Sequence, residues 1–242
     1  MTDDGYFDED VAVTYDSLHG ATDATDIRRT VDCLLDLADG GDILEFASGT
    51  GRIALPLAAR GARVAGIELS QAMVRRMRAK ETGAPLDITI GDMTRARVPG
   101  DFALVALVFN SIDNLTTQDA QVACFANAAR HLRPGGRFVI ETQVPPLQRI
   151  PFGETRLAFA SDPDHFGIDA FDVATQGYTS HHIWPAREGH RHLAIPFRYA
   201  WPAEMDLMAR LAGLTRESRW AGWDRLPFDR FSTHHVSVWQ KV

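Results

Sequence analysis

Cysteine is scarce in this chain of 242 residues, which contains only Cys33 and Cys124. Two cysteines so far apart provide neither a disulfide framework nor the paired spacing of a zinc site, so we expect no metal. The acidic N-terminus also lacks the apolar segment of a secretory signal peptide. These absences favour a reducing compartment, and we expect a cytoplasmic protein.

Long apolar runs and basic clusters are missing as well. No apolar run approaches the ~18 residues that a membrane-spanning helix needs, so we expect no membrane partner. The formal net charge is -7, and no long run of lysine and arginine is present to follow a phosphate backbone. We therefore expect no nucleic acid partner. A small molecule remains as the expected ligand, bound by a monomer or a homodimer.

The composition is that of a folded globular protein. Hydrophobic residues make up 45% of the chain and charged residues 24%, which predicts a sizeable core and argues against global disorder. The length suits one large domain, or one domain with an embedded subdomain. The sequence contains no internal repeat and no low-complexity segment.

Short apolar runs alternate with helical patterns through the first 143 residues. Two helices are predicted at 9–18 and 23–38, and Asp23 would be the N-cap of the second. The alternation that follows predicts strands at 43–46, 63–68, 86–90, 102–109 and 137–141 and helices at about 52–60, 70–80 and 117–131. Pro56 predicts a late start or a kink in the first of these helices. Such alternation implies a parallel sheet covered on both faces, with ligands at the carboxyl ends of the strands.

The alternation ends after Gln143. Residues 145–163 are predicted as a loop, and two antiparallel strands are expected at 172–184 and 190–201, joined by a turn at 185–189. A helix and two strands complete the chain, at 202–213, 214–220 and 234–241. We therefore expect an α/β fold: a Rossmann-like doubly wound sheet that is mostly parallel, with an antiparallel terminal hairpin and a small inserted antiparallel subdomain.

Residues 43–51, ILEFASGTG, start as a buried strand and end as a loop that contains two glycines. Gly49 and Gly51 allow a ligand to come close to the backbone, and the helix after them points N–H groups toward it. Ala47 stands where a third glycine would be expected. We expect a negative φ at Ala47, so that only its backbone contacts the ligand.

Acidic residues stand at the ends of three consecutive predicted strands, as Glu45, Glu68 and Asp92. An acid at the position of Glu68 can accept hydrogen bonds from both ribose hydroxyls of an adenine nucleoside. The sequence around Asp92, GDM, offers polar and apolar groups for an adenine ring. The alternative is structural, with Glu68 beside a helix cap and Asp92 in a turn.

Together these segments resemble the class I S-adenosylmethionine-dependent methyltransferases. ILEFASGTG resembles their first motif, GIELS at 66–70 the ribose-binding acid motif, and GDM at 91–93 the adenine site. LRPGGRFVIE at 132–141 is similar to the turn into their fifth strand. VAVTYDSLHG, with Tyr15-Asp16, is similar to an N-terminal helix that closes over the cofactor. The likeness covers roughly residues 10–142, and the inserted sheet is more loosely similar to that of sugar-amine N-methyltransferases.

The resemblance implies S-adenosylmethionine as the cofactor and S-adenosylhomocysteine as its product. The methionine end would lie against Glu45, the ribose against Glu68 and the adenine against Asp92. Tyr15 would reach the carboxylate, and Asn110 would lie near the transferable methyl group. The complete implied set of cofactor residues is Tyr15, Glu45, Ala47, Gly49, Gly51, Glu68, Leu69, Met73, Asp92, Met93 and Asn110.

The implied function is transfer of a methyl group to nitrogen or oxygen of a small molecule, a natural product or an amino sugar, in specialised metabolism. Four regions would share it: a helical lid at 1–40, a cofactor-binding core at 41–143, an inserted substrate or dimer subdomain at 144–201, and the rest of the core at 202–242. Two alternatives stay open, a protein that binds the cofactor without transferring methyl and an NAD-dependent reductase. A reductase needs Gly-x-Gly-x-x-Gly, which ASGTG lacks.

Candidate catalytic and substrate residues come from two segments. Asp113 could orient or deprotonate an amine, or it could cap the next helix. His182 is the second candidate base, because antiparallel pairing around the predicted turn would put it opposite His192, with Trp184 opposite His190 on the same face. A shift of one residue would destroy this arrangement. The expected substrate contacts are Asn114, Trp184, Arg198 and Trp201.

Overall fold

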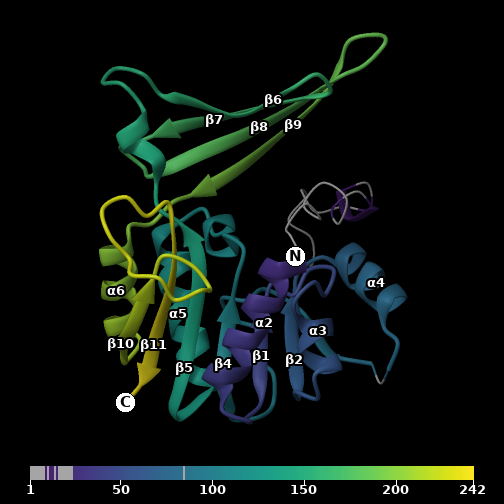
Figure 1. Cartoon of the computed structure of the whole chain (residues 1–242), viewed down its shortest axis with the longest axis vertical. Helices are drawn as coiled ribbons and strands as arrows, with labels where there is room; N and C mark the ends of the chain where they lie inside the picture. Colours follow the sequence, from purple (N-terminus) through teal and green to yellow (C-terminus); the bar gives the residue numbers. More distant parts are fainter. Residues whose placement is uncertain (1–8, 10, 14, 16–23, 84) are drawn as a thin grey trace.

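The computed structural model describes residues 9, 11–13, 15, 24–83 and 85–242. Its larger sheet contains β1 (Ile43–Phe46), β2 (Val64–Glu68), β3 (Asp87–Ile90), β4 (Phe102–Leu107), β5 (Leu132–Gln143), β10 (Leu214–Trp220) and β11 (His234–Lys241). These seven strands lie in the order β10-β11-β5-β4-β1-β2-β3 (Figure 1). The pairs from β5 to β3 are parallel, whereas β11 is antiparallel to both β5 and β10. The predicted Rossmann-like sheet with an antiparallel terminal hairpin is confirmed.

Helices cover both faces of this sheet. α2 (Ala24–Ala38) and α3 (Ala54–Ala59) pack on one face, and α5 (Gln118–His131) and α6 (Pro202–Leu211) pack on the other. α4 (Gln71–Lys80) follows β2, and two short 3-10 helices are η1 (Ser111–Asn114) and η2 (Pro146–Arg149). α3 starts late, as Pro56 predicts, since Pro56 falls in its first turn, where a missing N–H removes no helical hydrogen bond.

The central strands explain why the sequence shows continuous apolar runs. Every residue of β1 and of β4 is buried. Strands between two helical layers have both faces in the core, so their side chains do not alternate between apolar and polar. Glu45 is the one polar residue in β1. It carries a carboxylate, although only 2% of the residue is exposed.

A second sheet lies above the carboxyl ends of the parallel strands (Figure 1). It is antiparallel and consists of β6 (Arg156–Asp162), β7 (His165–Asp172), β8 (Gly177–Pro185) and β9 (His190–Arg198), in that order. The prediction of a loop over 145–163 is wrong where β6 forms, and the strand predicted from Asp172 begins only at Gly177. β6 was missed because most of its side chains are exposed, so its sequence lacks the alternation of a half-buried strand. β7 covers residues 165–172, where almost no strand was predicted.

The predicted pairing of β8 with β9 is wrong by one residue. His182 lies opposite Leu193 and Trp184 opposite Arg191, while His192 lies opposite Ile183. The reason is the turn: Pro185 belongs to the ladder, and Ala186 N–H donates to the carbonyl of Gly189. His182 and His192 therefore lie on opposite faces, because side chains alternate along a strand.

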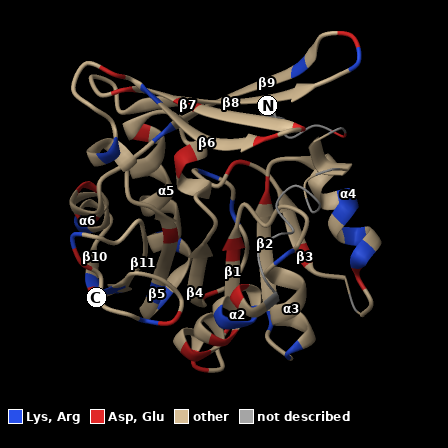
Figure 2. Cartoon of the chain, turned by 45° about the horizontal axis from the view of Figure 1, so that its top comes forward, with Lys and Arg blue, Asp and Glu red and all other residues tan. Residues whose placement is uncertain are grey.

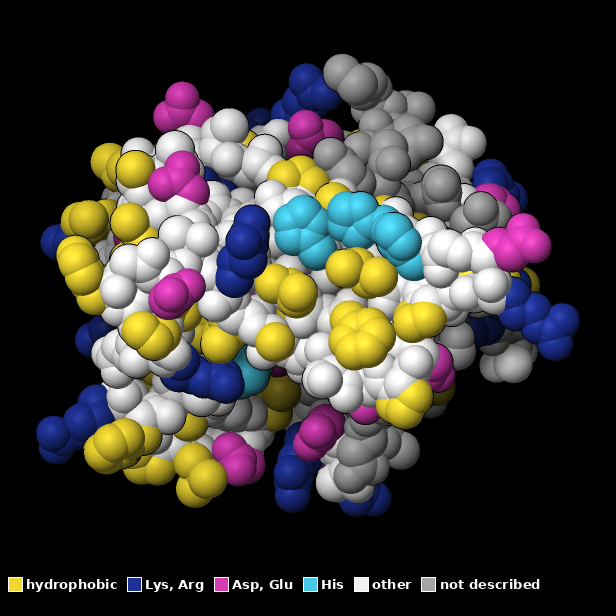
Figure 3. Space-filling model, turned by 90° about the horizontal axis from the view of Figure 1, so that it is seen from above, with side chains coloured by type: hydrophobic (Ala, Val, Ile, Leu, Met, Phe, Trp, Pro, Cys, Tyr) yellow, Lys and Arg dark blue, Asp and Glu magenta, His cyan; other side chains and the backbone are white. Residues whose placement is uncertain are grey.

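His192 lies on the outer face of the second sheet, together with His181. His181 Nδ1 lies 3.0 Å from His192 Nε2, and their rings are stacked. Figure 3, seen from above, shows histidine side chains in a row beside apolar side chains on this face. The exposed apolar side chains include Phe166.

The N-terminal region is described only in part. Residues 9, 11–13 and 15 are helical, in agreement with part of the helix predicted over 9–18. Asp16 and the predicted N-cap Asp23 lie outside the described residues. Ala12 and Tyr15 pack with Met73 of α4. No helix in the part of the chain that is described is long and apolar enough to cross a bilayer.

Candidate active site

Glu68 links the end of β2 to the glycine-containing loop. Its Oε2 accepts a hydrogen bond from Gly49 N–H at 2.7 Å, and its Oε1 accepts one from Ser70 N–H at 2.8 Å. Ser70 is in turn the N-cap of α4, where its hydroxyl accepts from Met73 N–H. Glu68 thus does lie beside a helix cap. A carboxylate offers several acceptor positions on its two oxygens, so a ligand role is compatible with this structural one.

The glycines around this loop have different functions. A Cβ on Gly51 would lie 2.6 Å from Met77 Cγ, and a Cβ on Gly66 would lie 2.2 Å from Ser48 Oγ, so packing excludes a side chain at both. A Cβ on Gly49 would meet only Ala47 O, at 3.9 Å. Gly49 is therefore required for its left-handed backbone, with a φ of 55°, and it leaves the loop open to a ligand.

The predicted negative φ at Ala47 is wrong, since its φ is 53°. The chain turns sharply at the end of β1, where Ser48 N–H donates to the carbonyl of Ile67 and Gly51 N–H donates to that of Ser48. These bonds hold Ala47 in the left-handed region, which costs an L-residue about 1–2 kcal/mol. Ala47 therefore occupies a position that suits glycine, and the loop is strained there.

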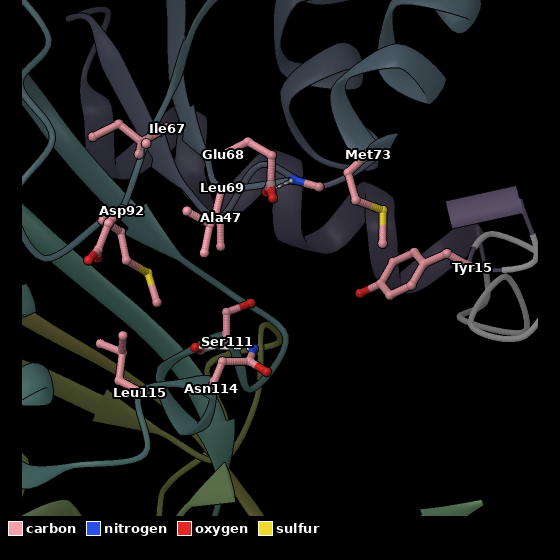
Figure 4. Close-up of a pocket in the computed structure, with 13 residues that line it drawn as sticks. Tyr15, Ala47, Ile67, Glu68, Leu69, Met73, Asp92, Ser111, Asn114 and Leu115 are labelled. Carbon is pink, nitrogen blue, oxygen red and sulfur yellow. Dashed lines mark hydrogen bonds between the residues drawn. The ribbon is translucent and has the colours of Figure 1, made fainter. Parts of the chain in front are cut away.

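A pocket opens above this loop at the carboxyl ends of β1, β2 and β3 (Figure 4). Its described lining includes these predicted residues: Tyr15, Ala47, Gly49, Glu68, Leu69, Met73, Asp92, Met93 and Asn114. Four further lining residues were not in the implied set of cofactor residues: Ile67 and Gly91, which belong to the GIELS and GDM segments, and Ser111 and Leu115. Their positions could have indicated the pocket. Ile67 and Gly91 lie at or just after the carboxyl ends of parallel strands, Ser111 lies in η1, and Leu115 follows it.

The pocket has two chemically different ends. Tyr15 and Met73 lie together at one end, and Asp92 lies with Ile67 at the other (Figure 4). Asp92 Oδ1 accepts from the N–H and the hydroxyl of Thr94 at 2.8 and 2.7 Å. Asp92 is thus a turn residue, as the structural alternative held, and it also lines the pocket.

Three of the predicted cofactor residues do not line the pocket. Gly51 packs against Met77 below the loop. Asn110 has a φ of 58°, and its side-chain oxygen accepts from Gln143 N–H at 2.7 Å, so it links the ends of β4 and β5. The third is Glu45, which is buried beneath the loop.

Glu45 is a buried carboxylate with an unsatisfied oxygen. Its Oε2 has no hydrogen-bond partner among the described residues. Burial raises the pKa of Glu45 to about 8, although Arg52 and the N–H of Ala54 act in the opposite direction. A cation close to the loop would stabilise the ionised form.

The chemistry of the lining suits a positively charged nucleoside. The described lining holds the carboxylates of Glu68 and Asp92 among apolar and hydroxyl side chains, and it includes no lysine, arginine or histidine. Acidic segments mark the ends of β1 and β2 in Figure 2. A pyrophosphate would be repelled here, whereas a sulfonium and an ammonium group would be attracted. The residues therefore fit S-adenosylmethionine better than a dinucleotide.

Asp113 lies in η1 but does not line the pocket. It is 1% exposed, and its Oδ2 accepts from Tyr178 Oη at 3.1 Å and from Gln143 Nε2 at 3.3 Å. Burial raises the pKa of Asp113 to about 7, and the hydrogen bonds from Gln143 and Tyr178 partly offset this. The carboxyl group joins η1 to β5 and to β8 of the second sheet, while its neighbour Asn114 faces the pocket.

The other predicted residues lie on the second sheet and after it, away from the pocket lining. His182 and Trp184 share one face of β8. Arg198 is 5% exposed and forms an ion pair with Glu204 at 2.8 Å, which points to a structural role. Trp201 precedes α6 and is 36% exposed. In the described part of the chain, no three His, Cys, Asp or Glu side chains are arranged to hold a metal ion.

Comparison with known proteins identifies the family. A family described as a methyltransferase domain matches residues 43–136. The CcbJ methyltransferase from Streptomyces caelestis has a similar structure, with a TM-score of 0.85, 33% sequence identity and coverage of 96% of each chain. The cypemycin N-terminal methyltransferase of a Streptomyces species is 27% identical over 183 residues, 73% of each chain. The dTDP-3-amino-3,4,6-trideoxy-alpha-D-glucopyranose N,N-dimethyltransferase of Streptomyces venezuelae is 33% identical over 103 residues, 43% of each chain. The chain therefore belongs to the class I S-adenosylmethionine-dependent methyltransferases, enzymes whose methyl donor is S-adenosylmethionine.

Proposed function

We propose that this enzyme methylates a nitrogen or an oxygen of a small molecule, with natural products and amino sugars as the leading acceptor classes. The observation that carries the proposal is the single pocket that joins acidic and apolar side chains from three strand ends with Tyr15 and η1. The names of two amino-sugar relatives describe N,N-dimethylation, which favours nitrogen as the acceptor atom. The proposal includes no nucleic acid partner and fits a monomer or a homodimer.

The residues of the pocket would act mainly by alignment. When bound, S-adenosylmethionine supplies a methyl group on a positively charged sulfur, which is already a strong electrophile. Glu68 would hold the ribose hydroxyls, and Leu69 and Met93 would pack against adenine. The acceptor would enter from the side of η1, where Ser111 and Asn114 line the pocket. Alignment of this kind supplies much of the rate, and a base is needed only if the acceptor must lose a proton.

The regions outside the core would complete the site. Tyr15 lines the pocket from the N-terminal helix, so the segment 1–40 would act as a lid. The second sheet lies over the strand ends, so the segment 144–201 would form the acceptor side of the site or a dimer contact (Figure 1). We assign residues 41–143 and 202–242 to the cofactor-binding core.

Incubation of the full chain with methyl-labelled S-adenosylmethionine tests the proposal. The acceptor panel would contain amino sugars, secondary amines and hydroxylated natural products, with products identified by mass spectrometry. We expect label in at least one acceptor, with one equivalent of S-adenosylhomocysteine per methyl group transferred. Intact cofactor binding without a product from a broad panel would favour the non-catalytic alternative.

A further inference from the structure

The second sheet has an inner face, which is defined by Tyr178. The hydroxyl of Tyr178 reaches Asp113 in η1, so this side chain points toward the core. Side chains alternate along a strand, so Ser180, His182 and Trp184 share its face. The register places Asp169 opposite Ser180 and Gly167 opposite His182. His165 precedes Gly167 by two residues in β7, so it lies on the same face. The Tyr178–Asp113 hydrogen bond places this inner face beside η1, and β8 lies above the ends of the parallel strands (Figure 1).

Asp169 is the only acid that the register places on the described inner face of β7 and β8, and the exposed Asp162 of β6 lies on the same face, opposite His165. It accepts a hydrogen bond from the hydroxyl of Ser180, which is 7% exposed. Its Oδ1 is buried and has no hydrogen-bond partner among the described residues. Burial raises the pKa of Asp169 to about 6, against the effect of Ser180, so at neutral pH it is mostly ionised. An ionised carboxylate that is buried and has only one of its two oxygens hydrogen-bonded is costly, and a bound cation would stabilise it.

Aromatic rings surround the next positions along the same face. The rings of His165, His182 and Trp184 are stacked, with centroids 5.1 to 5.6 Å apart. Phe159 of β6 meets the His182 ring edge-on at 5.1 Å. Gly167 makes this possible, because a Cβ there would lie 2.1 Å from the Phe159 ring. Phe159 stays 46% exposed, so this aromatic surface is accessible.

We propose that the inner face of the second sheet binds the methyl acceptor as a protonated amine, with its ammonium group on Asp169 and its apolar part on the rings of Phe159, His182 and Trp184. The ammonium gives one proton to the Asp169 carboxylate, and the freed nitrogen lone pair then forms the bond to the methyl carbon as the bond from that carbon to sulfur breaks. This inference rests on the proposed methyltransferase function and names the substrate class. A carboxylate with an open acceptor position next to aromatic rings attracts an ammonium group by charge and by cation–π contact. A neutral hydroxyl acceptor would leave the charge of Asp169 unpaired.

Binding measurements on the full chain, saturated with S-adenosylhomocysteine, test this assignment. The probes are N-methylcyclohexylamine and its neutral analogue cyclohexanol, followed by ligand-observed NMR titration. We expect the amine to bind more tightly to the wild type, and Asp169→Asn to weaken the amine roughly 10-fold or more without changing the affinity for cyclohexanol. The matched control is Asp101→Asn, at an exposed position outside the second sheet, which should leave both affinities unchanged.

A second variant keeps the test decisive if Asp169→Asn does not fold. Phe159→Leu removes the exposed ring and should weaken the amine by about 2- to 5-fold, whereas the Trp184 ring already carries the Arg191 guanidinium at 5.0 Å. Equal binding of amine and cyclohexanol to the wild type, or an amine affinity that neither variant changes, would overturn the assignment. The affinity for S-adenosylhomocysteine should be the same in all variants. If the wild type did not bind S-adenosylhomocysteine, that result would instead contradict the methyltransferase function.

Discussion

Ala47 carries backbone strain at the floor of the cofactor pocket. Its φ of 53° lies in the left-handed region, where the Cβ of an L-residue is unfavourable. Ala47→Gly removes that strain but adds freedom to the unfolded chain, which costs about 0.4–1 kcal/mol. We expect the free energy of unfolding to stay the same or to rise by up to about 1 kcal/mol, measured by urea denaturation.

The control for this prediction is Ala65→Gly in β2. Ala65 is 8% exposed and belongs to a regular strand, so glycine there should destabilise the protein by about 1 kcal/mol. A loss at Ala47 as large as the loss at Ala65 would show that the left-handed backbone carries no strain.

Single residues of the site were predictable where their chemistry was unusual for their position. Glu68 and Asp92 stood out because acids follow apolar strands at the edge where ligands bind. The φ of Ala47 was not predictable, because the hydrogen bonds that fix it come from Ser48 and from the neighbouring strand. The absence of Glu45 from the pocket lining also depends on the loop folding over it, which residue type does not reveal.

Among the elements, η1 is coupled to the second sheet through Asp113. Its pKa of about 7 in the folded protein is above the ordinary 3.8, so the folded state holds the proton more tightly than the unfolded chain. The free energy of unfolding should therefore fall as pH rises from about 4 to about 7, by roughly 1.4 kcal/mol for each unit of pKa shift, and then level off.

Asp113→Asn should remove this part of the pH dependence, because the amide oxygen can still accept from Tyr178 and Gln143. Thermal or urea unfolding of both proteins over this pH range measures the effect. Asp101→Asn, at an exposed position, should keep the wild-type slope. A slope in Asp113→Asn as steep as in the wild type would mean that another group causes it.

Arg198 connects β9 with two helices. Its guanidinium forms an ion pair with Glu204 of α6 and a hydrogen bond to Gln121 of α5, and its carbonyl accepts from Gln121 Nε2 at 2.9 Å. Arg198→Met would leave Glu204 without its cation in a mostly buried position. We expect a loss of about 3–5 kcal/mol in the free energy of unfolding.

The exposed Arg191 on the same strand is the matched control. Its guanidinium contacts only the Trp184 ring among the interactions described, so Arg191→Met should change the free energy of unfolding by less than about 1 kcal/mol. Adding Glu204→Gln to Arg198→Met should recover part of the loss, since the unpaired charge is then gone. Equal stabilities for Arg198→Met and Arg191→Met would exclude the structural role.

The elements of the core were predictable because its central strands β1, β2 and β4 are buried on both faces and because helices such as α4 and α5 begin at clear caps. β10 and β11 begin and end where the pattern places them. The second sheet was less predictable, because the alternation of side chains in β6 is weak and the turn after Pro185 allows two registers. A shift of one residue moved His192 to the outer face, and only the full hydrogen-bond ladder determines that outcome.

At the scale of the whole molecule, the cofactor pocket lies at the carboxyl ends of the parallel strands, and the second sheet lies above them (Figures 1 and 2). The core sheet supplies the acids, η1 joins it to the second sheet through Asp113, and the inner face of that sheet presents Asp169 and the aromatic rings. This arrangement separates two tasks. Cofactor binding depends on the core, and the choice of acceptor depends on the inserted strands.

The central claim is that Glu68 holds S-adenosylmethionine in the pocket of the core. Isothermal titration of the wild type, Glu68→Ala and the exposed control Glu188→Ala with S-adenosylhomocysteine and with NAD tests it most directly. The account predicts that the wild type and the control bind S-adenosylhomocysteine and not NAD, and that Glu68→Ala weakens this binding roughly 10- to 100-fold, on the scale of hydrogen bonds to a charged group. Binding of NAD alone, or an unchanged affinity in a folded Glu68→Ala variant, would contradict it.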